Sequence, residues 1–326
     1  MAQSENLMAI DRLSSLPDDI LCHILSLLPT KFAFTTTVLS KQWTQLCGSL
    51  TSLRSDDEET VRDCSHFNSF CRMVNAVMLS PREPNHPIKT FYINCRFGFC
   101  KNGSRIFSAW VEAANQRSVE EFHLSNSITL KLNPTIFTSK TLVVLKLERL
   151  VVKAENLCVD LPSLKILSLK EICFTYNKDI MKLLNGCPVL EDLHTFGREY
   201  TRFVEDNAAE GFKPLSKLHT CGTRKYFQNH PLFQNLIHIK LWLYGFIHGW
   251  NGVVELLQQC PKLQVLFIRR WNWSLPMEWK CPILALECIS CHLRMRSSYE
   301  TWKSKLLLAA QMIAAQMGYL CKIVKL

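Results

Sequence analysis

One short pattern of leucines and isoleucines returns along most of this chain. Each copy reads L-x-x-L-x-L or close to it, and successive copies begin about 20 to 28 residues apart. The clearest copies lie at residues 142–147, 164–169, 190–194, 236–241 and 263–268. Weaker copies lie at 88–97, 119–124, 215–221 and 284–289. Because the spacing is so regular, the sequence predicts an array of similar structural units.

The alternation inside each copy predicts a β-strand, since residues two apart on a strand point to the same face. One unit cannot bury its leucines alone, whereas stacked neighbours share a continuous core. Short helical segments at 177–184 and 252–257 precede two of the strands. Cys-Pro pairs at 187–188, 260–261 and 281–282 mark the ends of helical segments. We therefore expect an α/β leucine-rich-repeat solenoid with a parallel sheet on its concave face.

Residues 11–50 follow a different rhythm. Apolar residues recur there with the period of one helical face, starting at Ile20 and ending at Leu28. Pro17 suits the first turn of that helix, and Pro29 ends it. Thr30 and Ser40 are candidate N-caps for a second and a third short helix. A unit this small cannot bury so many large side chains, so part of its apolar surface is expected to face a partner.

These residues resemble an F-box, in the order Leu-Pro-x-x-Ile-Leu-x-x-Ile-Leu-x-x-Leu-Pro-Thr-Lys and then Val-Leu-Ser-Lys-x-Trp. That resemblance implies docking on a Skp-type adaptor, which links the protein to a cullin-based ubiquitin ligase. The residues that would form or support the docking surface are Leu16, Pro17, Ile20, Leu21, Ile24, Leu28, Pro29, Val38, Leu39 and Trp43.

Two positions depart from the usual F-box pattern. Gln42 stands where a basic residue commonly precedes the tryptophan, and Cys47 stands where a second tryptophan is common. Since a cysteine offers less area than an indole ring, weaker adaptor binding is one expectation. The alternative function is a repeat protein that binds other proteins as a scaffold or decoy, without joining a ligase.

The phrases at 141–147, 161–165 and 186–193 resemble those of plant F-box proteins with leucine-rich repeats and a C-terminal FBD module, and the resemblance covers most of the chain. We expect an F-box at 11–54, a linker helix at 55–87 and the repeats at 88–292. A degenerate FBD-like cap is expected at 293–326, with a helix at 298–317 and a strand at 320–324. The implied function is a substrate-recognition subunit of an SCF-type ligase, whose repeats bind an unidentified target protein for ubiquitination.

Charge and apolar content indicate whether the chain is expected to bind nucleic acid, to span a membrane or to be secreted. Residues 1–60 hold four Lys/Arg and eight Asp/Glu, so 61–326 hold 34 basic and 20 acidic residues. The basic residues alternate with apolar ones and form no run of five, which favours a solvated face over nucleic-acid binding. The longest uncharged apolar run, 306–321, is shorter than the roughly 20 residues that span a bilayer. Without a signal-peptide pattern, 15 scattered cysteines favour reduced thiols in the nucleus or cytoplasm.

One cysteine cluster formally matches two cofactor sites. Cys288, Cys291 and His292 have the spacing used for covalent haem attachment, and Cys281 would complete a set of zinc ligands. Haem attachment needs an oxidising compartment, and strand alternation would point Cys288 and Cys291 to opposite faces. No motif for a nucleophile, a phosphate-binding loop or a zinc protease is present. We therefore expect no cofactor, no metal and no catalytic activity.

Aromatic residues and arginines gather late in the repeats. Because Trp and Arg are favoured at protein interfaces, this stretch is a candidate for binding the target. The alternative is that the rings fill a widened repeat core. The candidate residues are Trp242, Tyr244, Trp250, Arg269, Arg270, Trp271 and Trp273.

Overall fold

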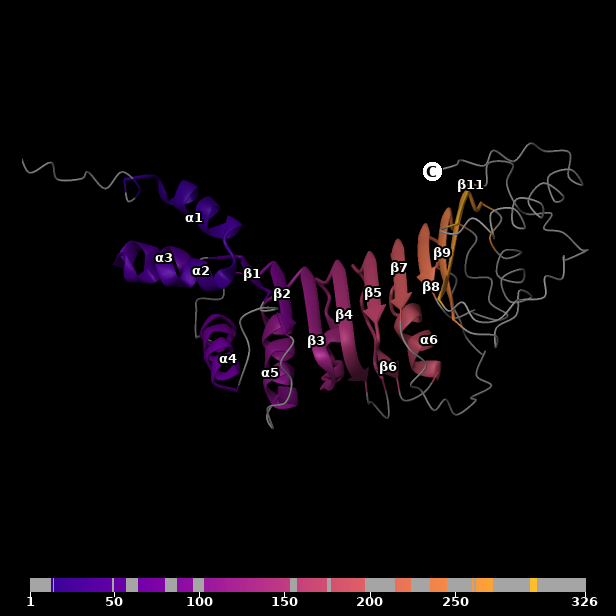
Figure 1. The fold of residues 1–326 in the computed structure, drawn as a ribbon, viewed down its shortest axis with the longest axis horizontal. Coiled ribbons are helices and arrows are strands. Elements are labelled where there is room, and N and C mark those ends of the chain that lie inside the picture. Colours follow the sequence, from indigo (N-terminus) through magenta and orange to yellow (C-terminus); the bar gives the residue numbers. More distant parts are fainter. Residues whose placement is uncertain are drawn as a thin grey trace, which may run out of the picture.

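The computed structural model describes residues 13, 15–48, 50–56, 64–79, 87–95, 103–152, 157–174, 177–196, 215–223, 235–244, 260, 262–271 and 294–297. Within these ranges, a group of short helices at the N-terminal end is followed by one 11-stranded parallel sheet (Figure 1). The predicted α/β class and the parallel sheet are confirmed. The expected strand at 284–289, the helix at 252–257 and the FBD-like helix and strand lie outside the described residues.

The N-terminal helices begin and end where the prolines predict. Helix α1 spans Asp18–Leu27 and α2 spans Thr30–Thr35, each directly after a proline. The 3-10 turn η1 at Thr36–Val38 leads to α3 at Lys41–Gly48. Because Asp18 and Asp19 lie in the first turn of α1, their negative charges complement the helix dipole.

The sheet is built from strands taken almost in chain order. Its order is β1-β2-β3-β4-β5-β7-β8-β9-β10-β11, and β6 pairs with β4. The strands are β1 Ser52–Asp56, β2 Thr90–Cys95, β3 Glu121–Leu132, β4 Val144–Val152, β5 Ile166–Lys170, β6 Cys173–Phe174, β7 Asp192–Phe196, β8 Thr220–Thr223, β9 His238–Tyr244, β10 Val265–Trp271 and β11 Arg294–Ser297. Strands therefore occur on both sides of the 88–292 range, at β1 and at β11.

The repeated leucines form a ladder of buried side chains across the sheet. The residues that share one register position are Leu53, Phe91, Phe122, Leu145, Leu167, Leu193, Cys221 and Ile239. All of them are at most 2% exposed. Two residues further along, Ile93, Leu124, Leu147 and Leu169 form a second buried row. This is the packing that the strand alternation predicts.

In four of the repeats, a leucine lies in a turn just before the strand. In four turns the amide of this leucine donates to the carbonyl of the residue three positions earlier, over 3.1 to 3.3 Å. These pairs are Leu164 to Leu161, Leu190 to Cys187, Leu218 to Leu215 and Leu263 to Cys260. Such a bond closes a β-turn, in which proline suits the second position. The Cys-Pro-x-Leu phrase is thus a turn that aims each chain into its strand.

Helices cover one face of the sheet. They are α4 Cys64–Met78, α5 Gly103–Gln116 and α6 Asn177–Asn185, together with the 3-10 turn η2 at Pro134–Thr138 (Figure 1). Trp110 of α5 packs edge-on against Phe107 and Phe70, and its indole N–H donates to Asn75 over 2.7 Å. These aromatic side chains and the strand leucines form one continuous core.

A glycine marks the closest approach between α6 and the preceding segment. A Cβ atom added at Gly186 would lie 2.4 Å from Cγ1 of Val159, which no side chain can tolerate without a shift. Just after it, Cys187 is fully buried, and its thiol donates to the carbonyl of Leu183 over 3.1 Å. At these two positions the space left by the surrounding chain therefore favours residues as small as glycine and cysteine.

Replacing Leu167 by alanine is expected to lower the free energy of unfolding by about 2–5 kcal/mol, because a fully buried position between β4 and β7 would be left with a cavity. The exposed neighbour Lys146, changed to alanine, is expected to alter it by less than about 0.5 kcal/mol. Urea unfolding of both variants measures the difference. Equal effects would contradict the ladder.

Candidate functional site

The N-terminal helices have a small hydrophobic core of their own. Its buried members are Leu21, Leu25, Ala33, Trp43, Leu46 and Cys47. They form a cluster separate from the core beneath the sheet. The helices therefore do not bury their whole apolar surface against the rest of the chain.

Helix α1 carries two apolar stripes about 100° apart. Leu21 and Leu25 are 0% and 1% exposed and face the small core. Ile20 and Leu27, which lie on the next face round the helix, are 47% and 71% exposed. One stripe holds the unit together, and the other is left in solvent.

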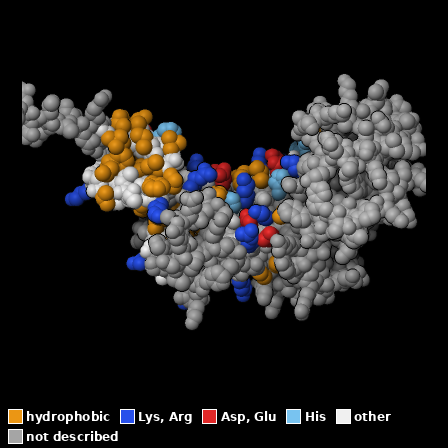
Figure 2. Space-filling model, in the orientation of Figure 1, with side chains coloured by type: hydrophobic (Ala, Val, Ile, Leu, Met, Phe, Trp, Pro, Cys, Tyr) orange, Lys and Arg blue, Asp and Glu red, His pale blue; other side chains and the backbone are white. Residues whose placement is uncertain are grey.

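Large apolar side chains of α1, α2, η1 and the residues that flank them are exposed, and we call them together the apolar surface. Its members are Leu13, Ile20, Leu27, Leu28, Phe32, Val38 and Leu39. Val38 and Leu39 are 85% and 60% exposed. Figure 2 shows hydrophobic side chains gathered over this part of the molecule. So large a patch on a small unit is typical of a surface that binds another protein.

The residues predicted for docking separate into three groups in the structure. Pro17, Ile20, Leu28, Pro29, Val38 and Leu39 are exposed, Leu16 and Ile24 are half-buried, and Leu21 and Trp43 are buried. The buried pair supports the surface from beneath. Leu27 and Phe32, which are 71% and 58% exposed, also belong to the apolar surface but are not among the residues that the F-box resemblance implies. A helical wheel of α1 would have placed Leu27 beside Ile20.

The two unusual positions are both used inside the helical unit. The side-chain amide of Gln42 donates to a carboxylate oxygen of Asp18 over 2.8 Å and ties α3 to the start of α1. Cys47 is 1% exposed, and its thiol donates to the carbonyl of Ala33 over 3.0 Å. Since Cys47 lies in the core, its small size takes no area from the exposed patch.

A short junction fixes the helical unit to the sheet. The backbone N–H of Arg54 in β1 donates over 2.7 Å to the hydroxyl of Thr30, which is 2% exposed. Phe34 of α2 packs against the core beneath the sheet. Strand β1 starts four residues after α3 ends. Because β1 pairs with β2 in regular register, the helices are held at one end of the sheet.

The face of the sheet opposite the helices carries a second candidate site. Its central row, which we call the open-face row, is set by strand register and alternates with the buried ladder. Its members are Arg54, Tyr92, His123, Lys146, Ser168, His194, Gly222 and Lys240. The described side chains among them are half-buried or exposed.

Side chains in the open-face row contact one another across neighbouring strands. The Arg54 guanidinium lies 5.3 Å from the centre of the Tyr92 ring, a cation–π distance. The rings of Tyr92 and His123 meet edge to face with their centroids 4.4 Å apart. Burial lowers the pKa of His194, and the charges of Lys240 and Lys146 lower it further, while Asp192 raises it.

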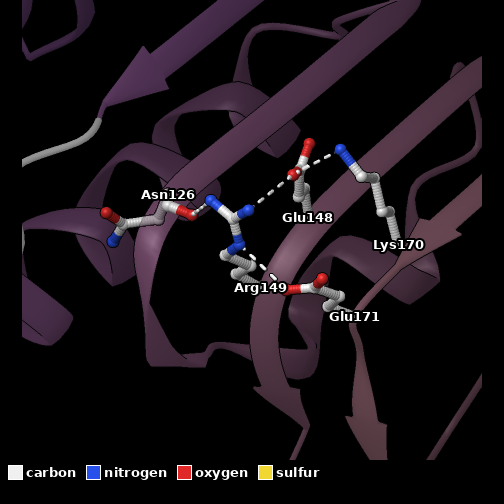
Figure 3. Close-up of polar contacts among 5 residues, drawn as sticks. All are labelled: Asn126, Glu148, Arg149, Lys170 and Glu171. Carbon is white, nitrogen blue, oxygen red and sulfur yellow. Dashed lines mark hydrogen bonds and ion pairs between the residues drawn. The ribbon is translucent and has the colours of Figure 1, made fainter. Parts of the chain in front are cut away.

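Beside this row, charged side chains in the middle of β4 and at the end of β5 neutralise one another (Figure 3). Arg149 donates to Glu171 over 2.9 Å, and Lys170 lies 2.7 Å from Glu148. Arg149 also reaches the backbone carbonyl of Asn126. Arg149 and Glu171 have φ angles of 55° and 53°, a left-handed conformation that few residues adopt. These pairs fix the edge of the open face.

The aromatic and arginine candidates lie on two neighbouring strands. Trp242 and Tyr244 end β9, and Arg269, Arg270 and Trp271 end β10. Register places Arg269 beside Trp242 and Trp271 beside Tyr244. Trp250 and Trp273 lie outside the described residues.

The described residues offer few reactive groups. Burial raises the pKa of Cys187 and of Cys221 to about 12, so both thiols stay protonated at neutral pH. Within the described ranges, no group of three His, Cys, Asp or Glu could hold a metal ion. Cys281, Cys288, Cys291 and His292 lie outside those ranges. Among the helices that the structure describes, none has the length and apolar character to cross a membrane.

Comparison with known proteins matches both parts of the molecule. The family model for the F-box domain matches residues 13–55. A second model, for the LRR repeats of the FBD-associated F-box protein At5g56370, matches residues 107–205. The chain therefore carries an F-box domain and, after it, leucine-rich repeats of the kind found in FBD-associated F-box proteins.

Similar proteins in Arabidopsis thaliana are named as F-box/LRR-repeat proteins or as FBD-associated F-box proteins. F-box/LRR-repeat protein At1g48400 is 36% identical over 223 residues, which cover 65% of this chain and 42% of that protein. Putative F-box/LRR-repeat protein At4g00320 is 26% identical over 78% of this chain and 71% of its own length. Putative FBD-associated F-box protein At3g50710 is 33% identical over 60% of this chain and 45% of its own length. The chain thus spans less than half the length of two of these relatives.

Replacing Thr30 by valine is expected to lower the free energy of unfolding by about 1–3 kcal/mol, because the N–H of Arg54 would lose its partner at a buried junction between F-box and sheet. Thr35, whose exposed hydroxyl bonds only within the F-box, is the matched control. Its change to valine should cost less than about 0.5 kcal/mol. Thermal unfolding of both variants provides the test, and an unchanged Thr30→Val protein would count against the junction.

Replacing Lys146 by glutamine is expected to raise the pKa of His194, since one of the positive charges that disfavour the protonated ring is removed. Asp192→Asn should lower that pKa, because it removes the charge that favours protonation. NMR titration of the His194 ring proton measures both changes. Shifts of the reverse sign would show that the open-face row is arranged differently.

Proposed function

We propose that this protein is the substrate-recognition subunit of an SCF-type cullin-RING ubiquitin ligase. In this proposal the F-box binds a Skp-type adaptor and, through it, a cullin. The leucine-rich repeats bind a target protein and hold it for ubiquitination. The chain itself performs no chemistry, and we place it in the nucleus or the cytoplasm.

The observation that carries the proposal is the exposed apolar surface of the F-box. The F-box has a core of its own and still leaves Leu27, Phe32, Val38 and Leu39 more than half exposed. Burying one such side chain against a partner contributes about 1.5–3 kcal/mol. Several such side chains together can offset the cost of association, which is on the order of 4–15 kcal/mol.

The junction between F-box and sheet supports a positioning role. The Arg54 to Thr30 hydrogen bond and the packing of Phe34 hold the adaptor-facing helices at a fixed place relative to the strands. A target bound to the repeats would then be kept near the enzyme that carries ubiquitin. The expected gain is effective concentration, which needs no catalytic group on this chain.

The alternative, a scaffold or decoy that does not join a ligase, rested on Gln42 and Cys47. Gln42 bonds to Asp18 and Cys47 is buried in the F-box core. Neither side chain contributes to the apolar surface, so neither departure gives a reason for weak adaptor binding. We therefore favour the ligase subunit.

The double variant Val38→Ser/Leu39→Ser is expected to bind a Skp-type adaptor at least 30-fold more weakly than the wild type. Both side chains are exposed in the free protein, so the substitution removes contact area without opening the core. Losing two apolar anchors corresponds to about 2 kcal/mol or more. Isothermal titration of the purified chain with the adaptor measures the change.

Leu79→Ser is the matched control, because Leu79 is 49% exposed but follows α4, outside the F-box. It should leave adaptor affinity within twofold of the wild type. If the wild-type chain binds no adaptor, or if the double variant binds as well as the wild type, the ligase assignment fails and the scaffold is favoured.

A further inference from the structure

From β1 to β9, the open-face row holds basic, imidazole and hydroxyl side chains. Its three cations, Arg54, Lys146 and Lys240, lie on β1, β4 and β9. The imidazoles of His123 and His194 lie between them. Tyr92 and Ser168 add hydroxyl groups, and β8 adds a glycine. The row thus offers hydrogen-bond donors and positive charge, with no carboxylate of its own.

Nearby ion pairs leave the cations of the row available. Lys170 and Arg149 are taken up by Glu148 and Glu171. Among the described residues, Lys146 and Lys240 form no ion pair, and both are exposed. The positive charge along the middle of the open face is therefore not compensated from within the sheet.

The spacing of these groups fits an extended peptide that crosses the strands. Neighbouring strands lie about 4.8 Å apart, so groups on alternate strands are separated by about 10 Å. Lys146, His194 and Lys240 follow one another at intervals of two strands. Arg54 and His123 are also two strands apart, but they are one strand out of step with that series because His123 pairs directly with Lys146. An extended chain advances about 3.3 Å per residue, so every third side chain recurs at about 10 Å.

Acidic side chains on both sides of the row limit what can bind. Glu121 and Asp192 lie in the adjacent row on one side, and Glu148 lies in the adjacent row on the other. A nucleic acid carries a charge at every nucleotide and would meet these carboxylates. A single peptide strand, with well-separated carboxylates, can pair with the central row and avoid its flanks.

We propose that the open-face row binds an extended acidic segment of the target protein, with carboxylates near every third residue. The segment runs across the strands from β4 to β9, so that its carboxylates lie over Lys146, His194 and Lys240. The carboxylates pair with the two lysines and accept a hydrogen bond from the imidazole between them. This inference rests on the proposed function, because it specifies what the repeats recognise.

The probe is a fluorescein-labelled peptide of four Glu-Ser-Gly repeats, and its neutral partner has Gln in place of Glu. Fluorescence anisotropy with the full chain, at about 50 mM salt to limit screening, measures both affinities. The Glu peptide is expected to bind at least tenfold more tightly. Lys146→Gln/Lys240→Gln should weaken its binding at least tenfold.

Lys217→Gln is the matched control, since Lys217 is exposed in the turn before β8 and lies outside the row. It should change affinity by less than twofold, and circular dichroism checks that each variant is folded. Equal binding of the two peptides would overturn the inference, as would equal losses from Lys217→Gln and from the double variant. Tighter binding of a single-stranded RNA that depends on Lys146 and Lys240 would also overturn it.

The same measurement on Val38→Ser/Leu39→Ser separates this inference from the proposed function. That variant should bind the Glu peptide like the wild type, because its substitutions lie in the F-box. If the peptide binds and the adaptor does not, the ligase proposal fails and the acidic-segment site stands. If the adaptor binds and the peptide does not, the reverse holds.

Discussion

The buried ladder shared by neighbouring strands is the interaction on which the rest of the molecule depends. From Leu53 in β1 to Ile239 in β9, each strand except β6 supplies one buried side chain at the same register position. No strand could shield this side chain from solvent without the neighbouring strands. Because the ladder occupies one parity of residues, the other parity is forced onto the open face, where it forms the row of basic, histidine and tyrosine side chains.

The F-box is likewise held together by a small set of buried side chains. Its six core residues are enough to order three short helices, and the next stripe of α1 is left outside. The unit is attached through β1, whose Leu53 is the first rung of the ladder. The apolar surface of the F-box and the open face of the sheet are therefore joined through one junction, at Thr30 and Arg54.

Much of this could be predicted from the sequence, because strand alternation and proline-bounded helices are local signals. The copy at residues 50–55 was not selected, since Ser55 stands where a leucine is usual, although Ser55 is buried. Which apolar residues of the F-box are exposed depends on how α1 packs against α3. This packing is not a local signal, so the resemblance alone does not predict that Leu27 is exposed. The open-face row joins residues from positions 54 to 240, and only strand register brings them together.

The hydrogen bond from β1 to Thr30 has a further consequence for solubility. A first strand in a sheet has backbone groups that can recruit a strand from another molecule, and proteins protect such edges. Here α2 lies against β1 and takes up one of its N–H groups. The F-box thus also caps the first edge strand of the sheet. Without the F-box, the backbone groups of β1 would be exposed and could pair with a strand of another molecule, which favours aggregation.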